Sequence, residues 1–215
     1  MVIFDCNGVL VDSEPIASVV LASALSRVGV TLSAEMVTRQ FQGRRPADIF
    51  AAIEKNTKRS LPPNFATTVA TETLRRFRAE LQPIPHAAHA LTWIRGPKAV
   101  ASSSPLGGIR TSLEVTGLLR FFEPRLSSHV AEGKPAPDLF LAAAAKLDTD
   151  PANCIVVEDS AAGIIAANAA GMTPIGFVGS HAGGRTVPEL MAAGARTVIA
   201  DMRALTSTII ELRGW

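Results

Sequence analysis

Short, uniformly apolar runs alternate along this chain with longer segments that carry apolar residues at helical spacing. The runs lack the apolar and polar alternation of a strand with one face in water, so they are typical of strands buried on both faces of a parallel sheet. We expect strands at Val2–Phe4, Ala99–Ala101, Ile155–Val157, Ile175–Val178 and Thr197–Ile199.

Helical periodicity fills the intervals between these runs in the second half of the chain. We expect helices over Pro105–Leu119, Pro137–Leu147, Ser160–Ala170 and Met202–Leu212. Gly171 favours the end of the third, because glycine readily takes the left-handed conformation that ends helices. Parallel strands joined by helices require right-handed crossovers. The pattern therefore predicts an α/β fold with a Rossmann-like, doubly wound parallel sheet.

The interval between the first two runs breaks this rhythm, because no strand-like run occurs from Glu14 to about Leu81. Helical patterns there cover Ile16–Val28, Glu35–Phe41, Pro46–Ile53 and Phe65–Leu81. Insertions are tolerated where the ends of an exposed loop lie close together. We therefore expect an inserted all-helical domain over residues 14–83 and an α/β core domain formed by residues 1–13 and 84–215.

Composition narrows the classes of function. The chain of 215 residues is 47% hydrophobic and 19% charged, which excludes intrinsic disorder. A net charge of +2 without a dense Lys/Arg run, and 5% aromatic residues, predict no nucleic-acid partner. No run approaches the ~20 apolar residues of a membrane span, and the N-terminus lacks the features of a signal peptide. We expect a cytoplasmic protein without a membrane partner, with Cys6 and Cys154 as buried thiols.

Polar residues follow three of the apolar runs. In open α/β sheets, ligands bind outside the carboxyl ends of the strands. Asp5 follows the first run, Ser102–Ser104 follow the second, and Glu158 and Asp159 follow the third. Crowded carboxylates repel one another unless a cation joins them, and Mg²⁺ prefers such oxygen ligands. Lys134 is a candidate for the positive charge beside a phosphate or a nucleophilic carboxylate.

Four motifs occur in order along the chain: FDCNGVLVDSE at 4–14, VASSS at 100–104, GKPAPD at 133–138 and VEDSAAG at 157–163. On these motifs the chain resembles the haloacid dehalogenase-like superfamily, in its phosphatase and phosphomutase branch with a helical cap. The helical insert after the first motif matches the position and character of the family's cap.

The resemblance assigns the nucleophile and the metal ligands. It implies that Asp5 takes the phosphoryl group as an aspartyl-phosphate, which splits a hard displacement into two steps. It also implies that Asp5, the main-chain carbonyl of Asn7 and Asp159 ligate Mg²⁺, with Glu158 as a ligand or directly behind the ligands.

The resemblance further implies contacts to the substrate. Ser102 would hold a phosphoryl oxygen, and Lys134 would offset charge on the phosphate and the nucleophile. Ser103 belongs to the same hydroxyl cluster and is expected to help bind the substrate. Gly43 and Arg44 resemble the family's cap contact loop, where Arg44 would bind a second anionic group; the alternative is a surface arginine.

Asn7 departs from the family pattern. Phosphatases and mutases of the family carry Asp two residues beyond the nucleophile, where it protonates the leaving oxygen and later activates water. The Asn7 carboxamide cannot exchange a proton near neutral pH, and losing general acid–base catalysis typically costs ~10²–10⁴ in rate. Two explanations stay open: a deliberate trapping variant of an active phosphatase, or a natural member with altered or lost catalysis.

The resemblance therefore implies a Mg²⁺-dependent phosphatase-type hydrolase that acts on small phosphorylated metabolites, most plausibly sugar or sugar-acid phosphates, and that Asn7 impairs. One alternative is a sugar phosphomutase resembling β-phosphoglucomutase. Another is a catalytically silent phosphate-binding member of the family. We expect a monomer or a homodimer.

Overall fold

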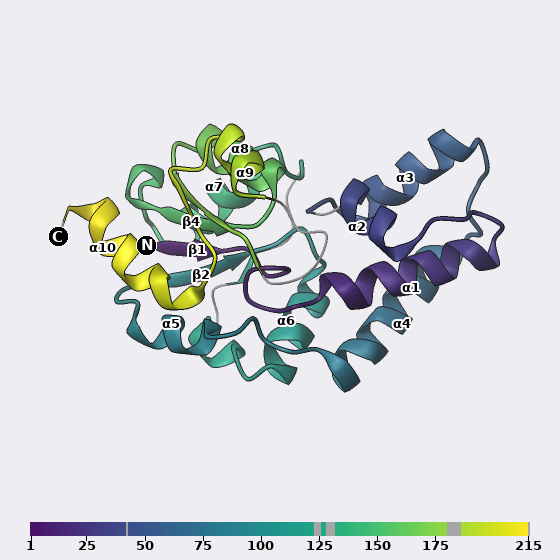
Figure 1. Ribbon diagram of the computed structural model, residues 1–215, viewed down its shortest axis with the longest axis horizontal. Coiled ribbons are helices and arrows are strands. Elements are labelled where there is room, and N and C mark those ends of the chain that lie inside the picture. Colours follow the sequence, from purple (N-terminus) through teal and green to yellow (C-terminus); the bar gives the residue numbers. More distant parts are fainter. Residues whose placement is uncertain (42, 123–125, 128–131, 180–185, 215) are drawn as a thin grey trace.

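A parallel sheet forms the centre of the larger part of the molecule (Figure 1). The computed structural model describes residues 1–41, 43–122, 126–127, 132–179 and 186–214, and over these residues the sheet has six strands in the order β3-β2-β1-β4-β5-β6. The strands are β1 (Val2–Phe4), β2 (Lys98–Ala101), β3 (Leu126–Ser127), β4 (Ile155–Glu158), β5 (Thr173–Phe177) and β6 (Thr197–Ile199). In β1, Phe4 pairs with Val100 of β2 and Val157 of β4, so these three strands end side by side.

Helices cover both faces of the sheet (Figure 1). Val2 and Phe4 pack on the face covered by three helices: α5 (Ala87–Trp93), α6 (Leu106–Val115) and α10 (Leu205–Arg213). Ile3 packs on the opposite face, against α7 (Asp138–Ala145) and α8 (Ala161–Ala169). On that side, α9 (Val187–Ala192) packs through Leu190 against Ile164 of α8. Helices therefore shield both faces of the sheet from solvent, which explains why its strands are uniformly apolar.

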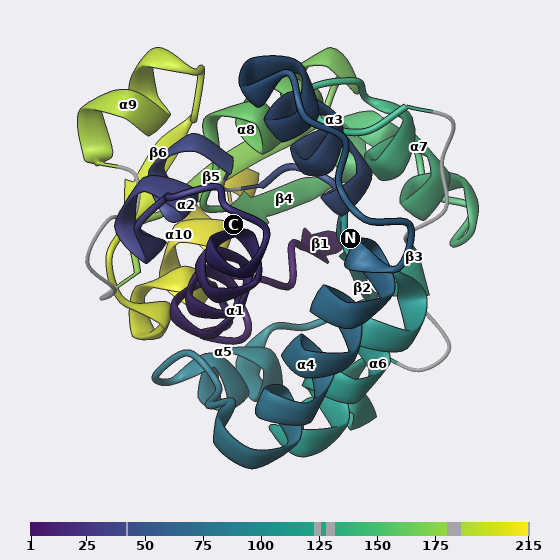
Figure 2. The ribbon, with the colours of Figure 1, turned by 90° about the vertical axis from the view of Figure 1, so that its right-hand side faces the viewer.

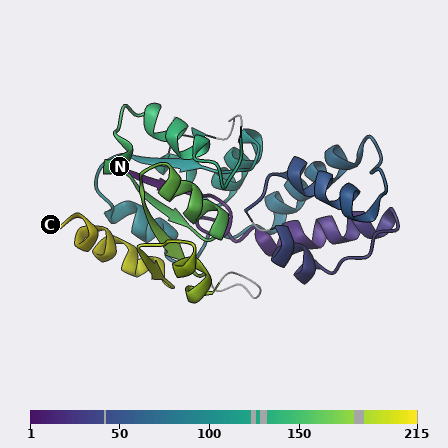
Figure 3. The same cartoon turned by 90° about the horizontal axis from the view of Figure 1, so that it is seen from above.

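Four helices lie beyond the carboxyl ends of the strands (Figures 1 and 3). They are α1 (Glu14–Arg27), α2 (Ala34–Phe41), α3 (Pro46–Thr57) and α4 (Phe65–Glu80). Leu21, Leu25, Phe41 and other residues of these helices form their own apolar cluster. Phe77 of α4 and Leu81 pack instead in the cluster beneath the sheet. The division into residues 14–83 and residues 1–13 with 84–215 remains a prediction.

The five strands and eight helices expected from periodicity are present, with changes at some ends. The helix expected over Pro105–Leu119 ends at Val115, shortly before Gly117, whose φ is 71°. A short 3-10 turn, η1, follows at Leu119–Phe121. The strand expected at Ile175–Val178 runs over Thr173–Phe177. Strand β3 and helices α5 and α9 were not predicted; two further short turns are η2 (Pro151–Asn153) and η3 (Met202–Ala204).

Cys6 and Cys154 are buried free thiols, as expected. Across the described residues, no helix combines the length and the apolar composition that crossing a membrane would require.

The core of the four-helix group predicts a stability effect. Leu25 is fully buried there, and Leu25→Ala should lower the free energy of unfolding by about 2–5 kcal/mol because it leaves a cavity. Met36→Ala on α2, where Met36 is 45% exposed, should change it by less than about 0.5 kcal/mol. Urea denaturation of both variants checks this, and equal losses would contradict a packed core in this group.

Candidate active site

Three adjacent strands bring polar residues to one edge of the sheet. Asp5 directly follows β1, Ser102 directly follows β2, and Glu158 is the last residue of β4. All three residues are buried. The four-helix group stands in front of this edge (Figure 2). The sequence prediction that these residues meet is therefore correct, because neighbouring strands of a sheet lie only about 5 Å apart.

Lys134 lies between two of these carboxylates. Its Nζ donates to Asp5 Oδ1 at 2.6 Å and also forms an ion pair with Glu158 Oε1. The same Nζ lies 5.3 Å from the centre of the Phe140 ring on α7. Burial lowers the pKa of Lys134, but the two carboxylates more than compensate, so its pKa is raised overall. Lys134 is therefore a charged ammonium held inside the protein.

The Asp5 carboxyl is strongly influenced by its surroundings. Burial raises its pKa most strongly, and the negative charge of Glu158 acts in the same direction. The charge and hydrogen bond of Lys134 and a hydrogen bond from the Asn7 main chain oppose this rise, and the resulting pKa is about 6. Near pH 6, Asp5 is therefore present in both its neutral and its ionised form. An additional cation nearby would favour the ionised carboxylate.

Glu158 is engaged on both of its oxygens. Oε1 contacts Lys134, and Oε2 accepts from the Ser160 main-chain N–H at 2.7 Å and from the Ser160 hydroxyl at 2.9 Å. A Cβ on Gly163 would lie 2.0 Å from Glu158 Cδ, so only glycine leaves room for this carboxylate on α8. Ser160 Oγ also accepts from the Gly163 N–H at 3.1 Å, which caps α8. Glu158 therefore holds Lys134 and the start of α8 in place.

Three buried carboxylates form a candidate metal centre. One oxygen each from Asp5, Glu158 and Asp159 lies within 4.8 Å of the other two. The turn after Asp5 packs closely on this group, since a Cβ on Gly8 would lie 2.0 Å from Asp159 Oδ2. An all-oxygen donor set of this kind fits Mg²⁺. Lys134 contacts Oε1 of Glu158 and Ser160 contacts its Oε2, so both oxygens of this carboxylate already have protein partners.

The serine cluster lies just before α6. Ser102 Oγ accepts from the Ser104 main-chain N–H at 3.3 Å. Ser104 Oγ accepts from Asn7 Nδ2 at 2.8 Å, which ties the turn after β1 to the segment after β2. Pro105 is the N-cap residue of α6, as the sequence suggested for the start of this helix. The main-chain donors and the positive end of the helix dipole make this edge favourable for an anion.

The loop between α2 and α3 contacts the core. The Gly43 carbonyl accepts from the Ser103 hydroxyl at 3.3 Å, and a Cβ on Gly43 would lie 2.7 Å from Ser160 Oγ. Gly43 has a φ of 79°, which glycine adopts at little cost. This loop thus brings the helical group against both the serine cluster and the start of α8.

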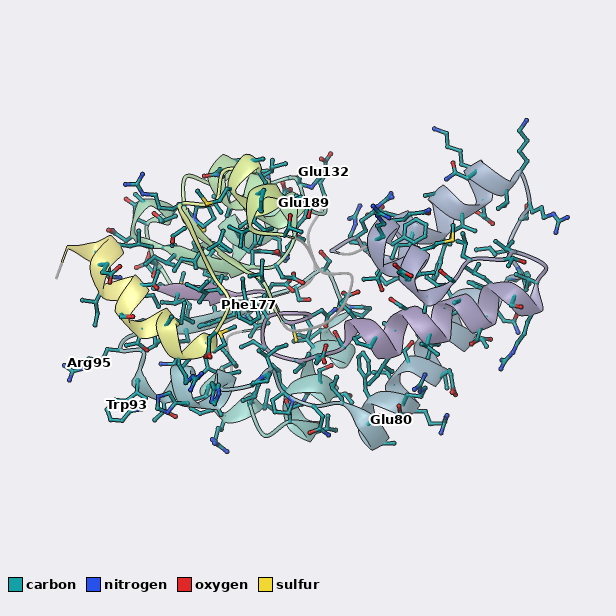
Figure 4. The ribbon with its side chains drawn as sticks, in the orientation of Figure 1. Glu80, Trp93, Arg95, Glu132, Phe177 and Glu189 are labelled. Atoms are coloured by element: carbon teal, nitrogen blue, oxygen red, sulfur yellow. The ribbon has the colours of Figure 1, made fainter. Side chains whose placement is uncertain are left out.

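Arg44 and Arg45 differ in their contacts. The exposed Arg44 donates to the Asp48 carbonyl at 3.3 Å, and its guanidinium lies 5.9 Å from the Phe41 ring centre. Its binding of a second anionic group remains a prediction. Arg45 was not singled out from the sequence, yet a Cβ on Gly133 would lie 2.7 Å from Arg45 Nε. Arg45 thus packs on the loop that carries Lys134. The pKa of Arg45 is raised mainly by its hydrogen bond to Asp48 at 2.8 Å, and the charge of Glu132, labelled in Figure 4, adds to this rise.

A cavity of about 490 Å³ lies between the sheet edge and the helical group. Asp5, Asn7, Ser102 and Asp159 are among the residues that line it. Glu14, which was not predicted as a site residue, also lines the cavity from the first turn of α1. Glu14 is the last residue of the first motif, and this position is the sequence feature that could have identified it as a site residue.

The Glu14 carboxyl is shifted toward its neutral form. Burial raises its pKa to about 7, and the charges of Asp5 and Asp12 contribute to this rise. Glu14 is therefore a second carboxyl of this cavity that exchanges a proton near neutral pH.

Comparisons with known proteins agree with this arrangement. A family model described as haloacid dehalogenase-like hydrolase matches residues 1–171. The chain is 33% identical to the 6-phosphogluconate phosphatase of Escherichia coli over 174 residues, which cover 80% of this chain and 79% of that protein. It is 55% identical to the β-phosphoglucomutase of Bacillus subtilis over 82 residues, which cover 38% of this chain and 32% of that protein.

The fold has a close match among solved structures. A conserved haloacid dehalogenase-like protein of unknown function from Agrobacterium tumefaciens superposes with a TM-score of 0.84 at 34% identity. The match covers 99% of this chain and 98% of that one.

The buried ion pairs predict that Lys134 is needed for stability. Lys134→Met should lower the free energy of unfolding by about 3–5 kcal/mol at pH 8 without added metal, because two buried carboxylates lose their counter-charge. The loss should shrink at pH 5, where Asp5 becomes protonated. Lys55→Met, on the exposed surface of α3, is the matched control and should be nearly neutral. An equal effect of both variants in urea denaturation would contradict this account.

The raised pKa of Glu14 predicts a pH dependence of stability. The folded protein retains the Glu14 proton up to about pH 7, whereas the unfolded chain releases it near the ordinary value of 4.5. The contribution of the Glu14 proton to the free energy of unfolding is therefore fully present below pH 4.5 and is lost as the pH rises through 7.

Replacing Glu14 should remove this dependence. As the pH rises from 5 to 8, the free energy of unfolding of Glu14→Gln should increase relative to that of the parent chain, by an amount on the order of 1–3 kcal/mol. Urea denaturation at each pH, without added metal, measures the difference between the two chains. A difference that stays constant with pH would show that the Glu14 carboxyl titrates normally.

Proposed function

Since the chain belongs to the haloacid dehalogenase-like hydrolase family and its phosphatase relatives mark it as a phosphoric monoester hydrolase, we propose that it is a Mg²⁺-dependent phosphatase of small phosphorylated metabolites. In this proposal Asp5 is the nucleophile, and the reaction proceeds through a phosphorylated Asp5. One observation carries the proposal: Asp5, Glu158 and Asp159 converge as buried carboxylates at adjacent strand ends, with Lys134 as their counter-charge.

The residues around Asp5 prepare it for attack on phosphorus. Lys134 binds one carboxylate oxygen at 2.6 Å and so fixes the orientation of the side chain. Ser102 and Ser103 would donate to the oxygens of the bound phosphate, next to the start of α6. Attack forms the bond between an Asp5 oxygen and phosphorus and breaks the bond between phosphorus and the substrate oxygen. Positioning of this kind accounts for most of the catalysis of phosphoryl transfer.

The metal would be held by Asp5, Asp159 and the main-chain carbonyl of Asn7, with Glu158 behind them. When bound, Mg²⁺ supplies positive charge that screens the phosphate and orients it toward the nucleophile. Lys134 would balance the remaining negative charge of Asp5 and Glu158.

Asn7 limits the two proton transfers of the reaction. The departing alkoxide needs a proton, and the water that hydrolyses phosphorylated Asp5 must lose one. The Asn7 side chain donates to Ser104 Oγ at 2.8 Å and cannot supply or accept a proton near neutral pH. We therefore expect substrate binding to persist while both the attack by Asp5 and the later hydrolysis are slow.

The helical group acts as a cap in this proposal. Its Gly43 loop contacts Ser103 and Ser160, so closure of the group would exclude water from Asp5. The Escherichia coli relative named for 6-phosphogluconate supports the expectation of a sugar or sugar-acid phosphate. The Bacillus subtilis relative keeps a sugar phosphomutase as the alternative. Cytoplasmic location and a monomeric or homodimeric state remain predictions from the sequence.

The role of Asn7 gives the decisive test. Asn7→Asp should raise the rate of Mg²⁺-dependent phosphate release by about 10²–10⁴, because it restores a group that exchanges protons. Ser104 tolerates the change, since its hydroxyl can donate to a carboxylate where it now accepts from the amide. Release of inorganic phosphate from p-nitrophenyl phosphate and 6-phosphogluconate measures the effect. Chelation with EDTA should abolish it.

The double variant Asn7→Asp with Asp5→Ala is the matched control and should be inactive. If Asn7→Asp interconverts the isomeric glucose phosphates without releasing phosphate, the mutase alternative holds instead. If the parent and Asn7→Asp chains both release no phosphate and Asp5→Ala changes nothing, the proposed mechanism is wrong.

A further inference from the structure

Glu14 is the first residue of α1, and it lines the same cavity as Asp5. The chain between these two residues makes a tight turn, in which the Gly8 N–H donates to the Val11 carbonyl at 2.9 Å. The turn reverses the direction of the chain before α1 begins, and this reversal explains why Glu14 returns to the cavity that Asp5 lines. The half-buried Glu14 carboxyl therefore belongs to the same cavity as the proposed nucleophile.

Among the described residues that line this cavity, four have acidic or basic side chains: Asp5, Glu14, Arg44 and Asp159. Asp5 is the proposed nucleophile, and Asp159 is a proposed metal ligand. The guanidinium of Arg44 keeps its proton in a protein, so it does not take part in proton exchange. Within this described set, Glu14 is therefore the group that remains for the proton transfers that Asn7 cannot carry out.

The geometry of phosphoryl transfer places the leaving oxygen on the side of Glu14. The attacking and leaving oxygens lie roughly in line through phosphorus. Asp5 would attack from the sheet edge, and the cavity lies between this edge and the helical group. The leaving oxygen would therefore face the helical group, and Glu14 stands where this group begins.

The acid–base properties of Glu14 suit this position. Burial, followed by the negative charges of Asp5 and Asp12, raises its pKa to about 7. The basic side chain in the described lining, Arg44, instead donates to the Asp48 carbonyl within the helical group. Near neutral pH the Glu14 carboxyl is thus present in both forms. A group with a pKa near the working pH is well suited to give up a proton and to take it back.

We propose that Glu14 transfers the proton in both steps of the reaction and so sustains the slow turnover of the parent chain. This inference rests on the proposed phosphatase function. In the first step, an Asp5 oxygen bonds to phosphorus, the bond from phosphorus to the substrate oxygen breaks, and the Glu14 proton moves to that oxygen. In the second step, a water oxygen bonds to phosphorus, the bond from phosphorus to Asp5 breaks, and a proton of the water returns to Glu14.

Glu14→Gln tests the proposal, because it keeps the shape of the side chain and removes the exchangeable proton. With p-nitrophenyl phosphate and Mg²⁺, kcat should fall at least about tenfold, since the water that attacks phosphorylated Asp5 loses its base. By contrast, kcat/KM should fall less than about threefold, because it reports the first attack and p-nitrophenolate leaves without a proton. A misplaced Asp5 would slow that attack as well, so equal losses in kcat and kcat/KM would overturn the proposal.

The Asn7→Asp background separates proton transfer from a structural effect. There Glu14→Gln should lower kcat less than about threefold, because the new carboxylate accepts the proton instead. A structural defect would cost the same in both backgrounds, and that result would overturn the proposal. Glu35→Gln is the matched control, since Glu35 is an exposed first-turn residue of α2 outside the described lining, and it should leave kcat unchanged.

The same four chains distinguish failure of this inference from failure of the proposed function. If Asn7→Asp releases phosphate and the parent chain releases none, Glu14 transfers no proton and the phosphatase proposal still stands. If neither chain releases phosphate, the phosphatase proposal is wrong, and the role of Glu14 is wrong with it.

Discussion

The ammonium of Lys134 between the Asp5 and Glu158 carboxylates is the interaction on which this site depends. Buried carboxylates at neighbouring strand ends repel one another and lose the solvation of water, so they require a counter-charge within contact distance. Lys134 provides it from a loop 129 residues away from Asp5. Burial raises the pKa of Asp5 and this counter-charge lowers it, so the pKa lies at about 6, where a further cation would favour the ionised carboxylate.

Close backbone packing maintains these charges in their positions. Gly8 leaves room for Asp159, Gly163 leaves room for Glu158, and Gly43 brings the helical group against Ser160. At each of these glycines an added Cβ would lie less than 3 Å from a polar side chain of the site. The site is therefore built on rigid elements, with strand ends and the first turn of α8 supporting it, as a reaction that depends on positioning requires.

Under the proposed function, the reaction and the choice of substrate depend on different parts of the fold. The sheet edge holds the carboxylates, the lysine and the serines, whereas the four helices from α1 to α4 supply the walls of the cavity. The helical group can therefore change the alcohol that fits without altering the chemistry at Asp5. This separation explains how one family architecture is compatible with relatives named for different phosphorylated compounds.

Sequence patterns alone predict five of the six described strands, most helices and the residues at the strand ends, because uniformly apolar runs indicate burial on both faces and parallel strands end together. It did not reveal β3, whose two residues are too few to show a pattern. The surroundings of Glu14 and Arg45, the hydrogen bonds from Ser160 to Glu158, and the apolar walls of the cavity became visible only in the folded structure. These features depend on how separate elements are oriented toward one another, and helical periodicity cannot distinguish an apolar residue of a packed core from one that faces a cavity.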